Sequence, residues 1–326
     1  MFIITGGAGF IGSALAWKLN QLGVEEIILV DSLGESDKWK NLRALKYLDY
    51  IEKDDFLWRL FDNFIQADNI TGIIHLGACS STTEKNASYL ASNNFDYSKQ
   101  LALYCVENEI PFIYASSAAT YGGGEKGYKD DEENVDSLRP LNMYGHSKQM
   151  FDQWAIRNGI MDRITGIKFF NVYGPNEYHK GNMASMVYKA YYQIKKDGKA
   201  RLFKSGDPDY KDGEQKRDFV YIKDVVNVIL QFMNNPQLTG LYNLGSGQAN
   251  TWNTLIGSIF KAMKIKKNIE YVDMQEELKG KYQYFTQADM EKVKSTGVEL
   301  EITPIEKAVK DYVINYLEKD NFLGDE

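Results

Sequence analysis

The chain has 326 residues, of which 44% are hydrophobic and 25% are charged, a composition typical of folded globular proteins and not of disordered ones. The formal net charge is −7 and the basic residues are spread along the chain, so we expect no nucleic-acid partner. No apolar run approaches the roughly 18 residues that cross a bilayer, so we expect no membrane span.

The first residues and the cysteine usage suggest a cytoplasmic protein. Residues 1–4 (MFII) already resemble a core strand, so we expect no cleavable signal peptide. Cys79 and Cys105 are too few for a disulfide framework, and the three histidines are scattered without metal-ligand spacing. We therefore expect no structural or catalytic metal.

Five apolar runs, each a helix's length beyond the last, predict the strands of a parallel sheet. They are continuous stretches rich in Val, Ile, Leu and Phe, as expected where helices cover both faces of the sheet. These runs are residues 2–5, 26–30, 72–76, 112–115 and 164–169. Later βα pieces at 219–225 and 241–246 are candidates to return to the same sheet.

The expected fold class is α/β, a doubly wound parallel sheet of the Rossmann type with a second, smaller α/β substrate-binding domain. We expect residues 1–170 to form the dinucleotide-binding domain, with 216–245 returning to it. Residues 171–215 and 246–326 are then expected to form the substrate-binding domain.

A glycine-rich turn lies between the first strand and the first helix. Residues 5–12 (TGGAGFIG) place Gly6, Gly9 and Gly12 where a tight turn, close approach to a pyrophosphate and helix–sheet packing need them. Asp31 follows the second strand, at the usual distance for a residue that binds ribose hydroxyls. This combination predicts a dinucleotide site.

The choice between NAD and NADP stays open on these residues. Asp31 favours NAD because it accepts hydrogen bonds from ribose hydroxyls, whereas Lys38 and Lys53 are candidates to pair with a 2′-phosphate. From spacing alone, a solvated loop charge is the favoured interpretation of Lys38.

A candidate proton-transfer site follows near residue 144. Tyr144 and Lys148 are four residues apart, on one face of a predicted helix that begins near Leu141. An ammonium group and a positively charged nicotinamide favour the phenolate, which makes Tyr144 a candidate base. Ser117 follows the fourth strand, at the sheet edge where such sites form. With 22 tyrosines in the chain, surface pairing is the alternative for this tyrosine–lysine spacing alone.

Seven segments resemble the extended short-chain dehydrogenase/reductases, and most closely the heptose epimerases of the NAD-dependent epimerase/dehydratase family. The segments are residues 5–12, 75–84 (HLGACSSTTE), 114–123 (YASSAATYGG), 140–148, 170–181 (FNVYGPNEYHKG), 216–221 (KRDFVY) and 278–289 (LKGKYQYFTQAD). The resemblance implies an isomerase of carbohydrate metabolism that inverts C6 of the heptose in ADP-D-glycero-D-manno-heptose, for lipopolysaccharide biosynthesis. It also implies bound NADP, with NAD possible, and a homo-oligomer for which a pentamer is one candidate.

The same resemblance assigns roles to individual residues. The two proton-transfer groups fall on Tyr144 and Lys180, with Ser117 and Lys148 assisting. The implied cofactor-binding residues, with those of the glycine turn, are Gly6, Gly9, Phe10, Ile11, Gly12, Asp31, Ser32, Lys38, Lys53, Leu76, Gly77, Ala78, Cys79, Ser80, Asn93, Lys148, Val172 and Lys180. The implied substrate-binding residues are Asn171, Asn182, Lys189, Phe203, Lys204, Ser205, Gly206, Arg217 and Tyr282.

The chain departs from the family pattern on the substrate side. A family serine appears as Asn182 and a histidine as Lys189, and a longer insertion follows residues 203–206 (FKSG). These departures therefore affect the expected identity of the nucleotide sugar more than any other expectation.

Two other classes of function remain as alternatives. A UDP-sugar 4-epimerase or a related nucleotide-sugar oxidoreductase would not need Lys180, whereas a dehydratase is disfavoured because Ala118 and Ala119 carry no proton. A non-catalytic dinucleotide sensor is disfavoured because Tyr144, Lys148 and Ser117 are all present.

Overall fold

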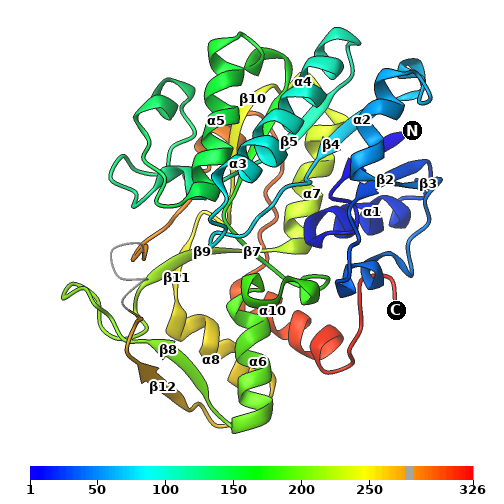
Figure 1. Cartoon of the computed structure of the whole chain (residues 1–326). Coiled ribbons are helices and arrows are strands. Elements are labelled where there is room, and N and C mark those ends of the chain that lie inside the picture. Colours follow the sequence, from blue (N-terminus) through cyan, green and yellow to red (C-terminus); the bar gives the residue numbers. More distant parts are fainter. Residues whose placement is uncertain (276–281, 326) are drawn as a thin grey trace.

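Seven parallel strands form the central sheet of the computed structural model, which describes residues 1–275 and 282–325 (Figure 1). Their order across the sheet is β10-β6-β5-β4-β1-β2-β3, so the chain moves outward from β1 in both directions. The strands are β1 (Phe2–Thr5), β2 (Ile27–Asp31), β3 (Asp49–Glu52), β4 (Gly72–His75), β5 (Phe112–Ser117), β6 (Thr165–Phe169) and β10 (Gly240–Leu244). This arrangement confirms the predicted doubly wound sheet.

Helices cover both faces of this sheet. Successive side chains of a strand point to opposite faces, so each strand contributes to two apolar clusters. Ile3 and Ile28 belong to one apolar cluster with α2 (Lys53–Phe61), α4 (Tyr97–Glu107) and α5 (Met143–Arg157). Their neighbours Ile4 and Leu29 belong to a second cluster with α1 (Phe10–Gln21) and α7 (Ile222–Asn234). The continuous apolar runs are therefore explained by burial on both sides.

The predicted strands agree with the structure to within a few residues. β5 extends through Ser116 and Ser117, and α1 begins at Phe10, inside the glycine-rich segment 5–12. β3 was not predicted, because Ile51 is its only fully buried residue and the run carries little apolar signal.

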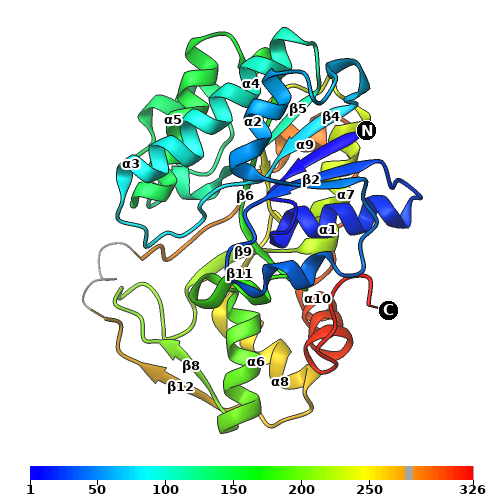
Figure 2. The same ribbon diagram turned by 45° about the vertical axis from the view of Figure 1, so that its right-hand side comes forward.

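Two smaller sheets lie beyond the carboxyl ends of the main strands (Figures 1 and 2). One joins β7 (Asn171–Tyr173), β9 (Lys216–Tyr221) and β11 (Ala249–Thr251), and the other pairs β8 (Ala200–Phe203) with β12 (Ile269–Val272) in parallel. Helices α6 (Met186–Asp197) and α8 (Trp252–Ala262) pack beside them in the lower half of both views. Within residues 216–245, β10 joins the main sheet whereas β9 belongs to the three-stranded one. The domain boundaries themselves stay a prediction.

Shorter helical segments complete the described chain. They are η1 (Asp37–Leu42), η2 (Ala67–Asn69), α3 (Ala87–Leu90), η3 (Ala91–Asp96), η4 (Ala118–Tyr121), η5 (Glu132–Ser137), η6 (Met161–Arg163), η7 (Tyr178–Met183), α9 (Glu291–Ser295), α10 (Ile305–Asp311) and η9 (Tyr312–Leu317). Among the described residues, no helix is long and apolar enough to cross a membrane, and no group of histidine, cysteine and acidic residues could hold a metal ion. Residues 278–281 of the last family-like segment lie outside the described part.

Candidate active site

The carboxyl ends of the central strands open on a cavity of about 970 Å³. All four predicted catalytic residues line it, and so do most of the predicted cofactor-binding residues. The latter are Gly6, Gly9, Phe10, Ile11, Gly12, Asp31, Lys38, Leu76, Gly77, Ala78, Cys79, Ser80, Lys148, Val172 and Lys180. The sheet edge therefore gathers residues that are far apart in the sequence, as is usual in doubly wound folds.

The glycine turn at the start of α1 has room for a diphosphate. Gly6 has φ +69°, and a Cβ atom on Gly12 would lie 2.1 Å from the Gly6 carbonyl oxygen, so neither position tolerates a side chain. Gly9 caps α1 without a side-chain hydrogen bond, which leaves the first amide groups of the helix free to bind an anion. The residues present thus fit the pyrophosphate of a dinucleotide.

Asp31 and Lys38 form an ion pair at the edge of this turn, with Nζ and Oδ1 2.8 Å apart. The same carboxylate accepts hydrogen bonds from the Ser32 amide at 2.7 Å and from the Ala8 amide at 3.0 Å. Lys38 also donates to the Ser32 carbonyl at 2.8 Å. Both carboxylate oxygens are therefore engaged before any ligand arrives.

Three predicted cofactor-binding residues do not line the cavity: Ser32, Lys53 and Asn93. Lys53 donates to the Asn93 side chain at 3.0 Å and lies 3.3 Å from the Asp54 carboxylate. Their roles stay predictions, and a ligand that extends beyond the cavity would be needed to reach them.

Tyr144 and Lys148 lie on the first turns of α5, whose start is fixed by Asn142. The Asn142 side chain accepts a hydrogen bond from the Gly145 amide at 2.8 Å. Lys148 Nζ donates to the carbonyl of Ala115 on β5 at 2.8 Å, which joins the helix to the strand that carries Ser117.

Burial shifts the pKa values of both side chains. It lowers the pKa of Lys148 to about 8, although the carboxylate of Asp152 acts in the opposite direction. Burial also raises the pKa of Tyr144, and a hydrogen bond with Ser117 partly offsets this effect. Without a bound cofactor, Tyr144 is therefore a neutral phenol at pH 7, beside a lysine that titrates close to that pH.

Lys180 lines the cavity from η7, an element separate from α5. Burial lowers its pKa, and the buried carboxyl of Glu177 opposes that shift. Glu177 also accepts a hydrogen bond from the Ser185 hydroxyl at 2.6 Å, which fixes both ends of the loop. Lys180 Nζ lies 5.3 Å from the centre of the Phe10 ring, next to the glycine turn.

The predicted substrate-binding residues divide into two groups. Those that line the cavity are Asn171, Asn182, Lys189, Phe203 and Tyr282, and those that do not are Lys204, Ser205, Gly206 and Arg217.

Arg217 lies directly behind the cavity wall. It is 6% exposed, and its guanidinium lies 5.0 Å from the Tyr282 ring centre and 5.9 Å from that of Trp252. The Trp252 indole N–H donates to the Tyr282 hydroxyl at 2.9 Å. Trp252 and Tyr282 line the cavity, so these contacts place the guanidinium group behind an aromatic part of its wall.

Sequence reasoning missed several cavity residues. Trp252, Gln193 and Arg201 line the cavity but belong to no motif that we identified, and His179 lines it but was given no role. The segment 170–181 contains His179, so the histidine beside Lys180 was the one available signal. The others reach the cavity only through long-range packing of α6, β8 and α8.

The fold and this cavity define an enzyme of the extended short-chain dehydrogenase/reductase class. The sequence profile of the NAD dependent epimerase/dehydratase family matches residues 2–245. The chain therefore belongs to the NAD dependent epimerase/dehydratase family, which confirms a nicotinamide dinucleotide as the class of cofactor.

Individual relatives narrow the similarity further. An ADP-L-glycero-D-manno-heptose-6-epimerase of Nitratidesulfovibrio vulgaris (strain DP4) is 51% identical over 317 residues, which cover 97% of this chain and 98% of the relative. One from Fusobacterium nucleatum is 48% identical over 331 residues, which cover 98% and 99%. The crystal structure of the Helicobacter pylori enzyme of the same name matches with a TM-score of 0.78 and 30% identity, covering 96% of this chain and 95% of that one. These matches confirm the predicted resemblance to the heptose epimerases.

Proposed function

We propose that the enzyme inverts C6 of the heptose in ADP-D-glycero-D-manno-heptose and so forms ADP-L-glycero-D-manno-heptose. The observation that carries the proposal is that Tyr144 and Lys180, on different elements, line the same cavity beside the glycine turn. The names and near-complete coverage of the relatives support the heptose as substrate.

Inversion of a carbon by oxidation and re-reduction requires proton transfer on both faces of the intermediate ketone. A nicotinamide dinucleotide held at the glycine turn (Gly6, Gly9 and Gly12) would supply the hydride acceptor and donor for C6. Tyr144, hydrogen-bonded with Ser117, and Lys180 are the two groups that we assign to moving the hydroxyl proton. We assign to Lys148 the role of favouring ionisation of Tyr144, and burial of Lys180 lowers the pKa of that lysine.

We further propose NADP as the preferred cofactor. Asp31 already accepts three hydrogen bonds, so its capacity to bind free ribose hydroxyls is reduced. Lys38 is held beside it with 22% of its side chain exposed, so its ammonium group can pair with a 2′-phosphate. The enzyme is expected to work in the cytoplasm as a homo-oligomer.

The direct test is incubation of the purified enzyme with ADP-D-glycero-D-manno-heptose and chromatographic separation of the two C6 epimers. We expect conversion by the wild type and none by Tyr144→Phe, which removes only the phenol oxygen and should keep the fold and the cofactor. UDP-galactose serves as the competing substrate. Turnover of UDP-galactose without turnover of the heptose would favour a 4-epimerase.

A further inference from the structure

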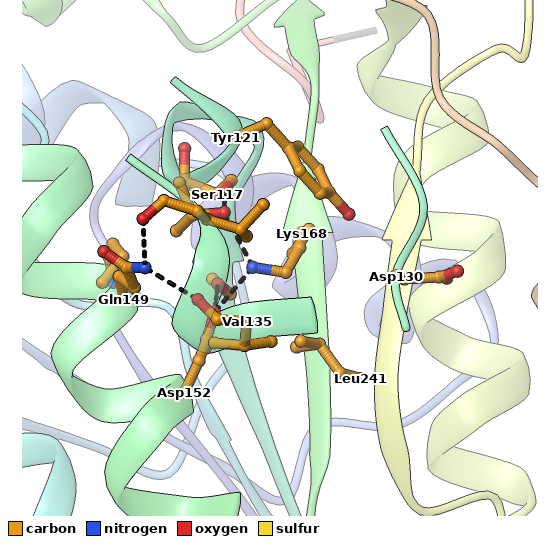
Figure 3. Close-up of polar contacts among 12 residues, drawn as sticks. Ser117, Tyr121, Asp130, Val135, Gln149, Asp152, Lys168 and Leu241 are labelled. Atoms are coloured by element: carbon orange, nitrogen blue, oxygen red, sulfur yellow. Dashed lines mark hydrogen bonds and ion pairs between the residues drawn. The ribbon is translucent and has the colours of Figure 1, made fainter. Parts of the chain in front are cut away.

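A fully buried ion pair lies beneath the proton-transfer site. Lys168, the residue before the last of β6, has its Nζ 2.7 Å from Asp152 Oδ2 on α5, and both side chains are 0% exposed (Figure 3). Buried ion pairs seldom stabilise a protein more than well-packed apolar residues of similar volume would. A contribution to global stability is therefore a weak explanation for this pair.

Each charge of the pair has several polar partners. Asp152 accepts hydrogen bonds from the Tyr114 and Ser116 hydroxyl groups, each at 2.8 Å. Lys168 donates to the Thr120 hydroxyl at 2.7 Å, and its Nζ lies 5.2 Å from the centre of the Tyr121 ring. The pair is thus the centre of a hydrogen-bonded network with fixed geometry.

This network connects directly to the residues that we assign to catalysis. The Thr120 hydroxyl, which accepts from Lys168, donates to the Ser117 carbonyl at 2.8 Å. Asp152 follows Lys148 by one turn of α5, and the two side chains bind adjacent residues of β5, Ser116 and Ala115.

We propose that the Asp152–Lys168 pair positions Ser117 against Tyr144 and Lys148 by cross-linking β5, β6 and α5. Neither residue of the pair lines the cavity, so both act through their neighbours and are positioning residues. The inference goes beyond the proposed function but rests on it for its kinetic test.

The test requires removal of both charges at once. A single substitution leaves the other charge buried without a partner, which destabilises the fold for reasons unrelated to positioning. The double variant Asp152→Asn/Lys168→Met keeps similar volumes and should fold.

A matched control exists at another site of the chain. Lys223 and Asp311 form an ion pair at 2.9 Å, and Asp311 also accepts from the Tyr221 hydroxyl at 2.7 Å. None of these three residues lines the cavity. The control is Lys223→Met/Asp311→Asn, which loses a similar tyrosine–carboxylate–lysine cluster.

We expect kcat for heptose epimerisation to fall about 100-fold in the Asp152/Lys168 double variant, the size of effect that a misplacement of about 1 Å can cause. The KM, NADPH affinity and Tm of the Asp152/Lys168 double variant should stay close to those of the Lys223/Asp311 control. The kcat of that control should equal the wild-type kcat. A folded double variant with wild-type kcat would overturn the proposal. So would failure of the double variant to fold, since the pair would then be a requirement of the fold itself.

A crystal structure of the double variant separates this proposal from the proposed function. If the wild type does not act on the heptose, the proposed function fails, but the Ser117 Oγ to Tyr144 Oη separation can still be compared between the two structures. A changed separation supports the positioning role, and an unchanged one refutes it.

Discussion

At the scale of single residues, Lys180 provides the sharpest test of two-sided proton transfer. We expect Lys180→Met to lose epimerisation while the cofactor stays bound, because the methionine retains much of the side-chain volume and removes only the ammonium group. Activity is measured by separation of the C6 epimers, and bound cofactor by absorbance after denaturation. Lys195→Met makes the same chemical change on the exposed surface of α6 and should be fully active. Full activity in Lys180→Met would refute the assignment of two groups.

A second prediction for a single residue concerns Lys38 and the preference for NADP over NAD. In Lys38→Ala the ratio of NADP to NAD affinity should fall about 10- to 100-fold, since a hydrogen bond to a charged group contributes about 1.5–3 kcal/mol. Titration with both nucleotides measures the ratio. Equal losses for NADP and NAD would show that Lys38 does not contact the 2′-phosphate.

Spacing alone could predict some of these residues but not their partners. Tyr144 and Lys148 are recognisable because their chemistry depends on one turn of a single helix. The ion pair of Asp152 with Lys168 was not predicted, because its members lie on different elements. Lys168 also interrupts an apolar run, so sequence pattern alone gives no reason for its complete burial.

At the scale of elements, Gly12 in α1 and Gly257 in α8 provide a matched pair of helical glycines. Gly12→Ala should abolish dinucleotide binding, because its Cβ atom would lie 2.1 Å from the Gly6 carbonyl oxygen and force the turn apart. The Cβ atom of Gly257→Ala would have only the Lys267 ammonium nitrogen within 4 Å, at 3.8 Å, so this variant should bind normally. It should also gain about 0.5–1 kcal/mol of stability. NADPH fluorescence and thermal unfolding measure the two effects, and normal binding by Gly12→Ala would contradict the proposed turn.

The elements that were predicted are those with a strong local signal. β1, β2, β4, β5 and β6 are continuous apolar runs that end in turns or polar residues. By contrast, β7 has three residues and exists because it pairs with β9, about 50 positions further along the chain. Pairing over such distances is decided by packing, which a local pattern does not contain.

At the scale of the whole molecule, the end of the chain contacts two segments far away in the sequence, the loop before Lys180 and the region around η1. The Leu323 amide donates to the Asn176 side chain at 2.9 Å, and Asp325 pairs with Arg43 at 3.1 Å. Residues 323–325 therefore connect the loop that carries Lys180 with the region around η1. Nothing in the composition of these last residues predicted this contact.

The acid sensitivity of the fold should depend on His75, which is buried at the centre of the main sheet. Ser98 donates its hydroxyl proton to the Asn94 carbonyl, so it can only accept from His75 Nε2, at 2.8 Å. His75 Nδ1 then accepts from the Thr5 hydroxyl at 2.6 Å, which requires a neutral imidazole. Consistently, burial and the nearby Lys148 lower the pKa of His75 to about 3.

Because the unfolded chain protonates this histidine near pH 6.5 and the folded protein only near pH 3, the unfolded state binds more protons between these values. The contribution of His75 to stability is therefore present above pH 6.5 and is lost as the pH falls towards 3, by about 2 kcal/mol between pH 7 and 5. His75→Gln can keep one donor and one acceptor but does not titrate, so the decrease between pH 7 and 5 should be smaller by that amount. Urea unfolding at both pH values measures the difference, with His146→Gln, an exposed histidine, as the control that should match the wild type. Identical pH dependence in wild type and His75→Gln would show that folding does not lower the pKa of this histidine.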